Sequence, residues 1–251
     1  MDMSRVAIVA AMEREVLPLV KRWRVSAKEH AGRSYRFFED GDIVIVCGGI
    51  GADAARRAAE AVIALYAPVI VYSAGFAGAL DPTLKVGEVM RPGRGVNASD
   101  GSSVMIAGGE GVLVSFASVA SPEQKAKLRD SYGAQIVDME AAAVARAAEA
   151  RGVEFAAVKA VSDEFDFSFP STERFVGADG QFRTARFAMF AGMRPWLWPQ
   201  VLGLARNSNR AARALCDSLG KIAITKVDAG ATAAPQNSAA DAPALEAANR
   251  R

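Results

Sequence analysis

A glycine-rich segment between an apolar run and an alanine-rich stretch is the first place where this chain could hold a ligand. Gly49, Gly51 and Ala54 have the spacing G-x-G-x-x-A, which is the form of a dinucleotide-binding loop. That interpretation requires an acidic residue about 20 positions further on, at the end of the next strand. The next apolar run ends instead in Ser73-Ala74-Gly75, which disfavours a nicotinamide or flavin site. A glycine loop at a helix start still offers backbone N–H groups to an anion or a polar sugar.

Residues that could bind a metal ion are few and far apart. The single histidine, His30, and the two cysteines, Cys47 and Cys216, show no metal-ligand spacing, so we expect no zinc site built on them. Asp163 and Asp166 could pair as ligands, but no further carboxylates cluster with them. We therefore expect neither a metal nor an organic cofactor. The two separated cysteines also indicate a reducing cytoplasm rather than a disulfide framework.

Five short segments, taken in order, carry a family resemblance. They are Ala11–Val16, Gly49–Gly51, Ser73–Glu88, Val137–Ala143 and Ala160–Asp163. Their sequences and order resemble the nucleoside phosphorylase/nucleosidase family (purine or other phosphorylase family 1), especially the methylthioadenosine/S-adenosylhomocysteine nucleosidases. The stretches DMEAA, starting at Asp138, and PTLKVG, starting at Pro82, are specific to that family, and the others gain weight as an ordered set.

The resemblance implies an enzyme that breaks the bond between a purine base and its ribose. That cleavage builds positive charge on the sugar and negative charge on the base, as in glycoside hydrolysis. The enzyme must protonate the departing base, hold the ribose and present water or phosphate to the far face of the sugar. We expect the substrate to be a 5′-modified adenosine, with adenine released by hydrolysis or, with phosphate as co-substrate, by phosphorolysis.

Two acidic residues match catalytic positions of the family. Asp163 matches the acid that delivers a proton to N7 of the purine, and its place just past a buried strand would favour the protonated carboxyl. Glu15 matches the residue that activates water in the nucleosidases. The alternatives, without the resemblance, are a loop-capping aspartate and a solvated glutamate in a first helical turn.

Further positions match substrate contacts of the family. Glu140 would bind the ribose hydroxyls and Met139 would pack against the ribose face, although a carboxylate at a helix start and a core methionine are the ordinary alternatives. The remaining implied contacts are Gly49, Ile50 and Gly51 on the sugar side, Ser73, Ala74 and Gly75 on the base side, Val119 through its backbone, and Ser162.

The chain departs from the nucleosidase pattern in ways that affect the pocket. Lys159 stands where family nucleosidases usually carry an arginine, which keeps the charge but loses the fork geometry. Phe76-Ala77-Gly78 is one residue longer than the usual glycine pair, which changes the base contacts. The segment Pro92–Glu110 is shorter, and Phe165–Leu219 is longer, than in methylthioadenosine nucleosidases. Both differences would remodel the pocket for the 5′-substituent.

These length differences are closer to the hopanoid-associated phosphorylases, which release adenine from an adenosyl-lipid using phosphate. The apolar stretch Met193–Leu204, with its two tryptophans, would suit a lipid-linked substrate, or it forms a packed helix junction. A phosphorylase acting on an adenosyl-lipid is therefore one alternative function. A nucleoside-binding protein without catalysis is another, which the joint presence of Glu15, Glu140 and Asp163 disfavours.

The elements that must position these residues alternate between short apolar runs and helical stretches. The patterns predict strands at Val6–Ala10, Tyr35–Glu39, Asp42–Val46, Val69–Tyr72, Glu88–Arg91, Gly111–Phe116, Ile136–Met139 and Phe155–Val161, and helices at Glu13–Arg22, Ala52–Tyr66, Pro122–Tyr132, Glu140–Arg151, Thr184–Met193 and Pro199–Leu219. Such alternation indicates an α/β protein with a mostly parallel sheet covered on both faces. The resemblance implies a three-layer α/β/α fold with a central mixed, mostly parallel sheet. We expect one domain at 1–221 and a disordered tail at 222–251.

Composition limits the class of partner. Apolar residues make up 51% and charged residues 23% of the chain, and the net charge is +2, which is the balance of a globular protein without the clustered positive charge that nucleic acid requires. The uncharged stretch Ala61–Leu80 contains Pro68, Gly75 and Gly78, which indicates a strand and a loop rather than a membrane span. The first residues do not read as a signal peptide. We expect a cytoplasmic protein and, from the resemblance, a homo-oligomer that is a dimer or larger.

Overall fold

The computed structural model describes residues 5–167 and 198–231, with isolated residues at 175, 177, 180, 183 and 187. Of residues 223–231 only the backbone is described. The strands are β1 Val6–Ala10, β2 Arg24–His30, β3 Arg33–Asp40, β4 Ile43–Cys47, β5 Ile70–Ala79, β6 Val89–Met90, β7 Arg94–Asn97, β8 Ser103–Met105, β9 Val112–Ser115, β10 Ile136–Asp138 and β11 Glu154–Asp163. The helices are α1 Glu13–Val20, α2 Ala52–Tyr66, α3 Pro122–Tyr132, α4 Ala141–Glu149 and α6 Trp198–Ala231.

In the described part of the chain, eleven strands form one sheet in the order β2-β3-β4-β1-β5-β10-β9-β7-β8, with β11 paired to β5 and β6. The centre is parallel, because β1 pairs in parallel with β4 and β5, and β5 pairs in parallel with β11. The pairs β2–β3, β3–β4 and β10–β5 are antiparallel. The sheet is therefore mixed with a parallel centre, as the sequence predicts.

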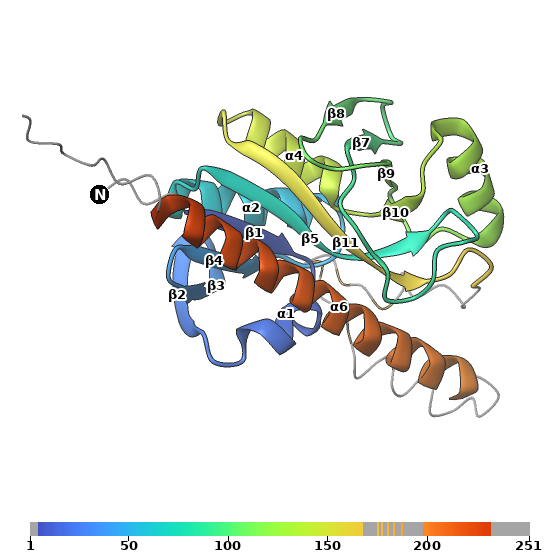
Figure 1. Cartoon of the computed structure of the whole chain (residues 1–251), viewed down its shortest axis with the longest axis horizontal. Coiled ribbons are helices and arrows are strands. Elements are labelled where there is room, and N and C mark those ends of the chain that lie inside the picture. The colour runs from blue at the N-terminus through green and yellow to red at the C-terminus, as the bar shows by residue number, and fades with distance from the viewer. Residues whose placement is uncertain are drawn as a thin grey trace, which may run out of the picture.

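Helices cover both faces of this sheet (Figure 1). In β1, Val6, Ile8 and Ala10 pack in one apolar cluster with α1 and α6, whereas Ala7 and Val9 pack in a second cluster with α2 and α4. Successive side chains of a strand point to opposite faces, so β1 is apolar throughout because both of its faces are buried. This arrangement confirms the predicted α/β/α layers.

Small residues permit the close approach of α2 to the strand ends. A Cβ placed on Gly48 would lie 2.5 Å from Cβ of Ala58 and 2.9 Å from the carbonyl oxygen of Ala54. The helix then begins after Gly51, whose φ of 95° lies in the left-handed region that favours glycine. Gly48 and Gly51 therefore allow the glycine-rich loop to turn directly from β4 into α2.

Helix α3 has clear start and stop signals. Ser121 caps its first turn by accepting a hydrogen bond from the backbone N–H of Gln124, and Pro122 occupies the first helical position. Gly133, with φ 61°, ends it. The helix begins and ends where the sequence predicts. These end signals fix which side chains of α3 face the rest of the protein.

Several elements differ from the sequence-based expectation. Strand β5 continues through Ser73-Ala74-Gly75 to Ala79, where a loop was expected, because β11 pairs with it along this whole length. Strands β2, β7 and β8 are short or polar and were not predicted. Helix α6 runs to Ala231 rather than Leu219, so residues 222–231 of the expected tail belong to a helix. Residues 232–251 and most of the expected helix Thr184–Met193 lie outside the described residues.

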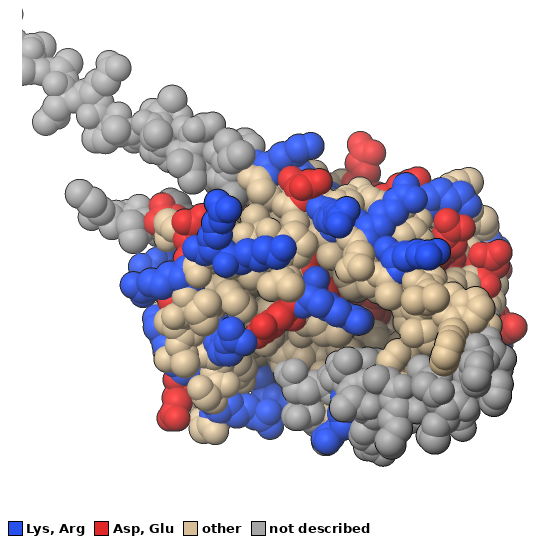
Figure 2. Space-filling model, turned by 90° about the horizontal axis from the view of Figure 1, so that it is seen from below, with Lys and Arg blue, Asp and Glu red and all other residues tan. Residues whose placement is uncertain are grey.

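The uncharged stretch Ala61–Leu80 forms the end of α2 and the whole of β5. Within the described ranges, no helix combines the length and the apolar character needed to cross a membrane. On the face shown in Figure 2, Lys and Arg side chains are interspersed with Asp and Glu. The surface charge there is mixed, in keeping with the near-neutral composition.

Candidate functional site

Glu15 in α1 is buried against β5. Its carboxylate oxygen Oε2 accepts hydrogen bonds from the backbone N–H groups of Ala11, at 3.0 Å, and Met12, at 3.1 Å. A Cβ placed on Gly75 would lie 3.1 Å from the same oxygen, so the missing side chain at Gly75 makes room for the carboxylate. The side chain is 2% exposed and burial raises its pKa, against the hydrogen bond from Met12 and the charge of Lys159. Glu15 is therefore a held, buried carboxyl and not a solvated first-turn glutamate.

Glu140 joins the glycine-rich loop to the start of α4. Its Oε1 accepts the backbone N–H of Gly51 at 2.9 Å, and its Oε2 accepts the backbone N–H of Met139 at 3.2 Å. Burial, and then repulsion from Asp138, raise the pKa of Glu140 to about 7, against the attraction of Lys159. The carboxyl is thus poised to change charge near neutral pH, directly beside the loop that the sequence predicts on the sugar side.

A buried ion pair lies under these carboxyls. Nζ of Lys159 is 2.8 Å from Oδ2 of Asp138 and donates to Oγ of Ser73 at 3.0 Å. Asp138 also accepts from Oγ of Ser115 at 2.6 Å and from the backbone N–H of Ala141 at 2.9 Å. Burial alone would lower the pKa of Lys159, but the surrounding carboxylates outweigh it and raise that pKa. The ion pair is fully hydrogen-bonded, as a buried pair must be to be stable.

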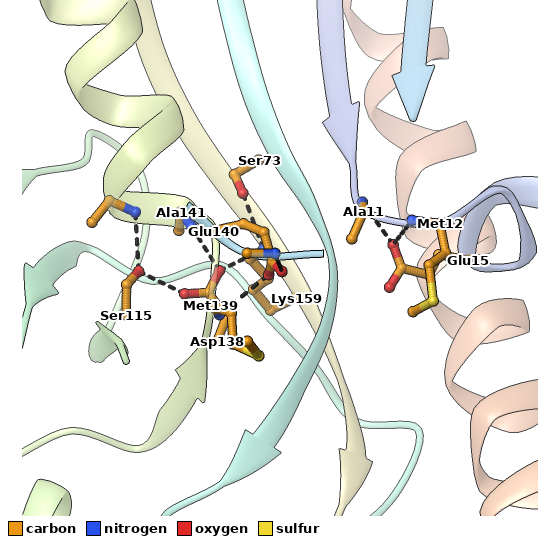
Figure 3. A network of polar contacts seen from close by, with 12 residues as sticks. Ala11, Met12, Glu15, Ser73, Ser115, Asp138, Met139, Glu140, Ala141 and Lys159 are labelled. Atoms are coloured by element: carbon orange, nitrogen blue, oxygen red, sulfur yellow. Dashed lines mark hydrogen bonds and ion pairs between the residues drawn. The ribbon is translucent and has the colours of Figure 1, made fainter. Parts of the chain in front are cut away.

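Figure 3 shows this network together with Glu15 and its two backbone donors. The charge of Lys159 acts on Glu15, Glu140 and Asp138. The sequence predicted Glu15, Glu140 and Ser73 as site residues. Lys159 donates to Ser73, and its charge acts to lower the pKa of both Glu15 and Glu140. Asp138 and Ser115 belong to the network but were not predicted; Asp138 lies within the DMEAA segment, which was a usable signal, whereas Ser115 had none.

Asp163, at the end of β11, is paired with a lysine of α3. Its Oδ2 accepts a hydrogen bond from Nζ of Lys125 at 2.5 Å, and its Oδ1 accepts from Oγ of Ser162 at 2.8 Å. Its side chain is 22% exposed, whereas that of Lys125 is 1% exposed. A buried ammonium therefore contacts the carboxylate of this partly exposed acid. No sequence pattern marked Lys125, which lies in a helix rich in polar residues.

The glycine-rich loop does not leave its N–H groups free. The backbone N–H of Gly49 donates to the carbonyl of Ala11 at 2.9 Å, and that of Ile50 donates to the carbonyl of Gly180 at 2.7 Å. The N–H of Gly51 is taken by Glu140. Each of these three N–H groups is thus already bonded within the protein.

The remaining predicted site residues differ in burial and in their distance from the polar network. Met139 is partly buried, between Asp138 and Glu140. Ala74 is buried within β5, between Ser73 and Gly75. Val119 is 54% exposed ahead of α3, so it does not pack into the polar network. Among the residues that the structure describes, no three His, Cys, Asp or Glu side chains form a group that could hold a metal ion.

The site thus has two parts along the paired strands β5 and β11. Lys159 stands opposite Gly75 in the register, beside the carboxyls of Glu15 and Glu140, and Asp163 stands opposite Gly78 with Lys125. Carboxylates that surround one position can stabilise a developing positive charge, and an acid further along can protonate a leaving group. This division matches the chemistry of N-glycosidic bond cleavage.

The comparisons with known proteins agree with this chemistry. An aminodeoxyfutalosine nucleosidase of Campylobacter jejuni is 25% identical over 207 residues, covering 66% of this chain and 90% of that protein. A 5′-methylthioadenosine/S-adenosylhomocysteine nucleosidase of Marinomonas sp. is 32% identical over 92 residues, covering 35% of this chain and 39% of that protein.

Among solved structures, the 5′-methylthioadenosine/S-adenosylhomocysteine nucleosidase of Neisseria meningitidis in complex with methylthio-immucillin-A is similar with a TM-score of 0.66. It is 22% identical and the match covers 88% of this chain and 98% of that one, which supports the fold. The family model described as the phosphorylase superfamily matches residues 5–111 and 102–190. The chain therefore belongs to the phosphorylase superfamily and, as the sequence predicts, is an enzyme that cleaves N-glycosyl bonds.

Proposed function

We propose that this protein hydrolyses the N-glycosidic bond of a 5′-modified adenosine and releases adenine. The observation that carries the proposal is the buried carboxyl of Glu15, held by two backbone N–H groups and facing Gly75. A carboxyl in that setting is suited to accept a proton from water, because burial raises its pKa and makes it a stronger base. The two relatives named above are both nucleosidases, which supports hydrolysis.

The proposed reaction assigns one task to each acidic residue. Asp163 gives its proton to N7 of the base, the bond between C1′ and N9 breaks, and its electron pair leaves with the base. Glu140 accepts hydrogen bonds from the ribose hydroxyls. Glu15 takes one proton from the water whose oxygen bonds to C1′, so nucleoside and water give free base and ribose. Glu15 then releases that proton to solvent and Asp163 regains one from solvent, which restores both residues.

Two observations favour water over phosphate as the nucleophile. A phosphate dianion beside Glu15 would meet a carboxylate, and like charges repel strongly where water is excluded. Phosphate sites also need cationic or backbone donors, but the N–H groups of Gly49, Ile50 and Gly51 are already bonded within the protein.

A second candidate function is phosphorolysis of an adenosyl-lipid. The observation that favours it is the exposure of Trp198, at 52%, and Leu202, at 56%, one turn apart at the start of α6. Exposed large apolar side chains that lie together are typical of binding surfaces. The rest of the stretch Met193–Leu204 that precedes Trp198 lies outside the described residues.

The decisive experiment measures adenine release from methylthioadenosine, S-adenosylhomocysteine and adenosine, each with and without phosphate. We expect release without phosphate from the wild type, and loss of it in Asp163→Asn and Glu15→Gln. Release that requires phosphate would replace hydrolysis by phosphorolysis. Adenosyl-lipid cleavage without cleavage of the three soluble substrates would favour the second candidate, and binding without release of any base would indicate a non-catalytic nucleoside-binding protein.

We also propose that the reaction runs without a metal or organic cofactor, since each step is a proton transfer or the attack of water. Dialysis against EDTA is then expected to leave the rate unchanged, and recovery of a lost rate by a divalent ion would contradict this. We further propose one catalytic domain that begins at the N-terminal strand and includes α6, which extends it beyond the expected boundary at residue 221. From the family resemblance we propose a homo-oligomer, a dimer or larger, and we propose that it is cytoplasmic. Light scattering of the full chain tests the oligomeric state.

A further inference from the structure

Helix α3 buries a lysine where a surface helix normally buries apolar residues. Its two buried residues are Lys125 and Leu128, three positions apart and thus on one face. A fully buried ammonium is costly unless it is paired and hydrogen-bonded. Nζ of Lys125 meets that condition, because it donates to Oδ2 of Asp163 at 2.5 Å and to the carbonyl of Glu164 at 2.6 Å.

The neighbouring strand leaves space for this pair. A Cβ placed on Gly78 would lie 2.9 Å from Oδ2 of Asp163 and 3.3 Å from Cε of Lys125. Any larger residue would push the carboxylate or the lysine stem aside. The pairing of Lys125 with Asp163 is thus built from three elements: α3, β5 and β11.

The charged groups around Asp163 are few among the described residues. Helix α3 contributes Lys125, and β5 contributes no titratable group at Gly78. Glu164, which follows β11, has its carboxylate 3.3 Å from the ammonium of Lys85. Ser162 adds an uncharged donor. The positive charge in direct contact with the acid therefore comes from Lys125.

We propose that Lys125 is a positioning residue for the proton donor: its ammonium fixes the Asp163 carboxyl and offsets the negative charge that remains on it after the base is protonated. This inference rests on the proposed function. When Asp163 gives its proton to the base, it becomes a carboxylate next to the ammonium of Lys125, so the proton transfer ends in an ion pair instead of an unpaired carboxylate. The ammonium keeps all its protons and is unchanged by the reaction.

Removing the ammonium should leave the Asp163 carboxyl less well placed and should leave its carboxylate without a partner after the proton transfer. Both effects act on the chemical step and not on substrate binding, so they should lower kcat and leave KM nearly unchanged.

The test compares adenine release from methylthioadenosine in the wild type, Lys125→Met, Lys125→Arg, Asp163→Asn and the double variant of Lys125→Met with Asp163→Asn. For Lys125→Met we expect kcat to fall about tenfold with KM nearly unchanged, and we expect Lys125→Arg, which keeps the positive charge, to recover part of the lost kcat. In the Asp163→Asn background, Lys125→Met should produce no further loss of kcat. Lys127→Met is the matched control, since Lys127 is exposed on the same helix, and should behave as wild type.

An unchanged kcat in Lys125→Met, or an equal loss of kcat with and without Asp163, would overturn the role of Lys125 while leaving the proposed function intact. A wild type that releases no base from any nucleoside overturns the proposed function, and this inference with it. Circular dichroism and urea titration check folding. If Lys125→Met is unfolded, Lys125→Gln, which keeps a hydrogen-bond donor without the charge, is expected to show the same loss of kcat with KM nearly unchanged.

Discussion

Replacing Glu140 by glutamine should change how the stability of the folded protein depends on pH. In the folded state the pKa of Glu140 is raised from its ordinary value of 4.5 to about 7, first by burial and then by the charge of Asp138. In the unfolded chain neither influence is present. The substitution removes the titrating group but keeps an oxygen that can accept the N–H of Gly51.

The sign and size of this pH dependence follow from the linkage between proton binding and folding. Below pH 4.5 the carboxyl is protonated in both states and contributes no pH dependence. Between pH 4.5 and pH 7 the unfolded state has lost the proton and the folded state has kept it, so the free energy of unfolding falls as pH rises. The rise in the pKa of Glu140 from 4.5 to about 7 corresponds to a total loss of about 3 kcal/mol in the free energy of unfolding. Above pH 7 this loss is complete.

Urea titrations of the wild type and Glu140→Gln at pH 4.5, 6 and 8 measure this. We expect the free energy of unfolding of the variant, relative to that of the wild type, to rise by about 3 kcal/mol between the lowest and the highest pH. The altered hydrogen bonds of the variant change its stability by the same amount at every pH and do not affect this difference. Glu149→Gln is the control, since Glu149 is exposed on the same helix α4 and should give parallel curves. Parallel curves for Glu140→Gln itself would refute a raised pKa. The variant should also bind methylthioadenosine more weakly, because its amide accepts fewer hydrogen bonds from the ribose hydroxyls.

Three further substitutions test other parts of the structure. Lys159→Met should lower the free energy of unfolding by about 3–5 kcal/mol, because Asp138 would keep a buried charge without its partner; a loss below about 1 kcal/mol in urea titration would contradict the buried ion pair. Gly78→Ala should lower kcat about tenfold to a hundredfold by displacing the Asp163 carboxyl with little change in the urea midpoint, and an unchanged kcat would count against that placement. Ser121→Ala should cost about 1 kcal/mol of stability through the lost helix cap, with adenine release unaffected.

The layers of the fold were predictable because burial on both faces leaves a direct mark on the sequence. Strand β1 is apolar at every position and α3 is bounded by Ser121 and Gly133, and both were placed correctly from these signals. The extension of β5 beyond Tyr72 was not predictable from its glycines, because pairing with β11 keeps that segment extended. Local propensity gives way there to tertiary hydrogen bonding.

Site residues were predictable only where a motif marked them. Glu15, Glu140 and Asp163 come from recognisable segments, and the structure puts the first two near the same lysine. Lys125 and Ser115 carry no such mark, because a lysine in a polar helix and a serine after an apolar run are both ordinary surface patterns. Their roles depend on contacts across 38 and 23 positions of sequence, which no local pattern encodes.

The distribution of charge explains why the two parts of the site differ. On the side that we propose for the sugar, burial raises the pKa of both Glu15 and Glu140 and so disfavours their ionised forms. In the proposed reaction, positive charge develops on the ribose as the glycosidic bond breaks and makes the ionised forms of these carboxyls more favourable. Their attraction would then be stronger in the transition state than in the ground state, which is the condition for catalysis. On the side that we propose for the base, the developing charge is negative, and there Lys125 contacts Asp163. The two sides therefore differ in the way that the charge developing in the proposed reaction requires.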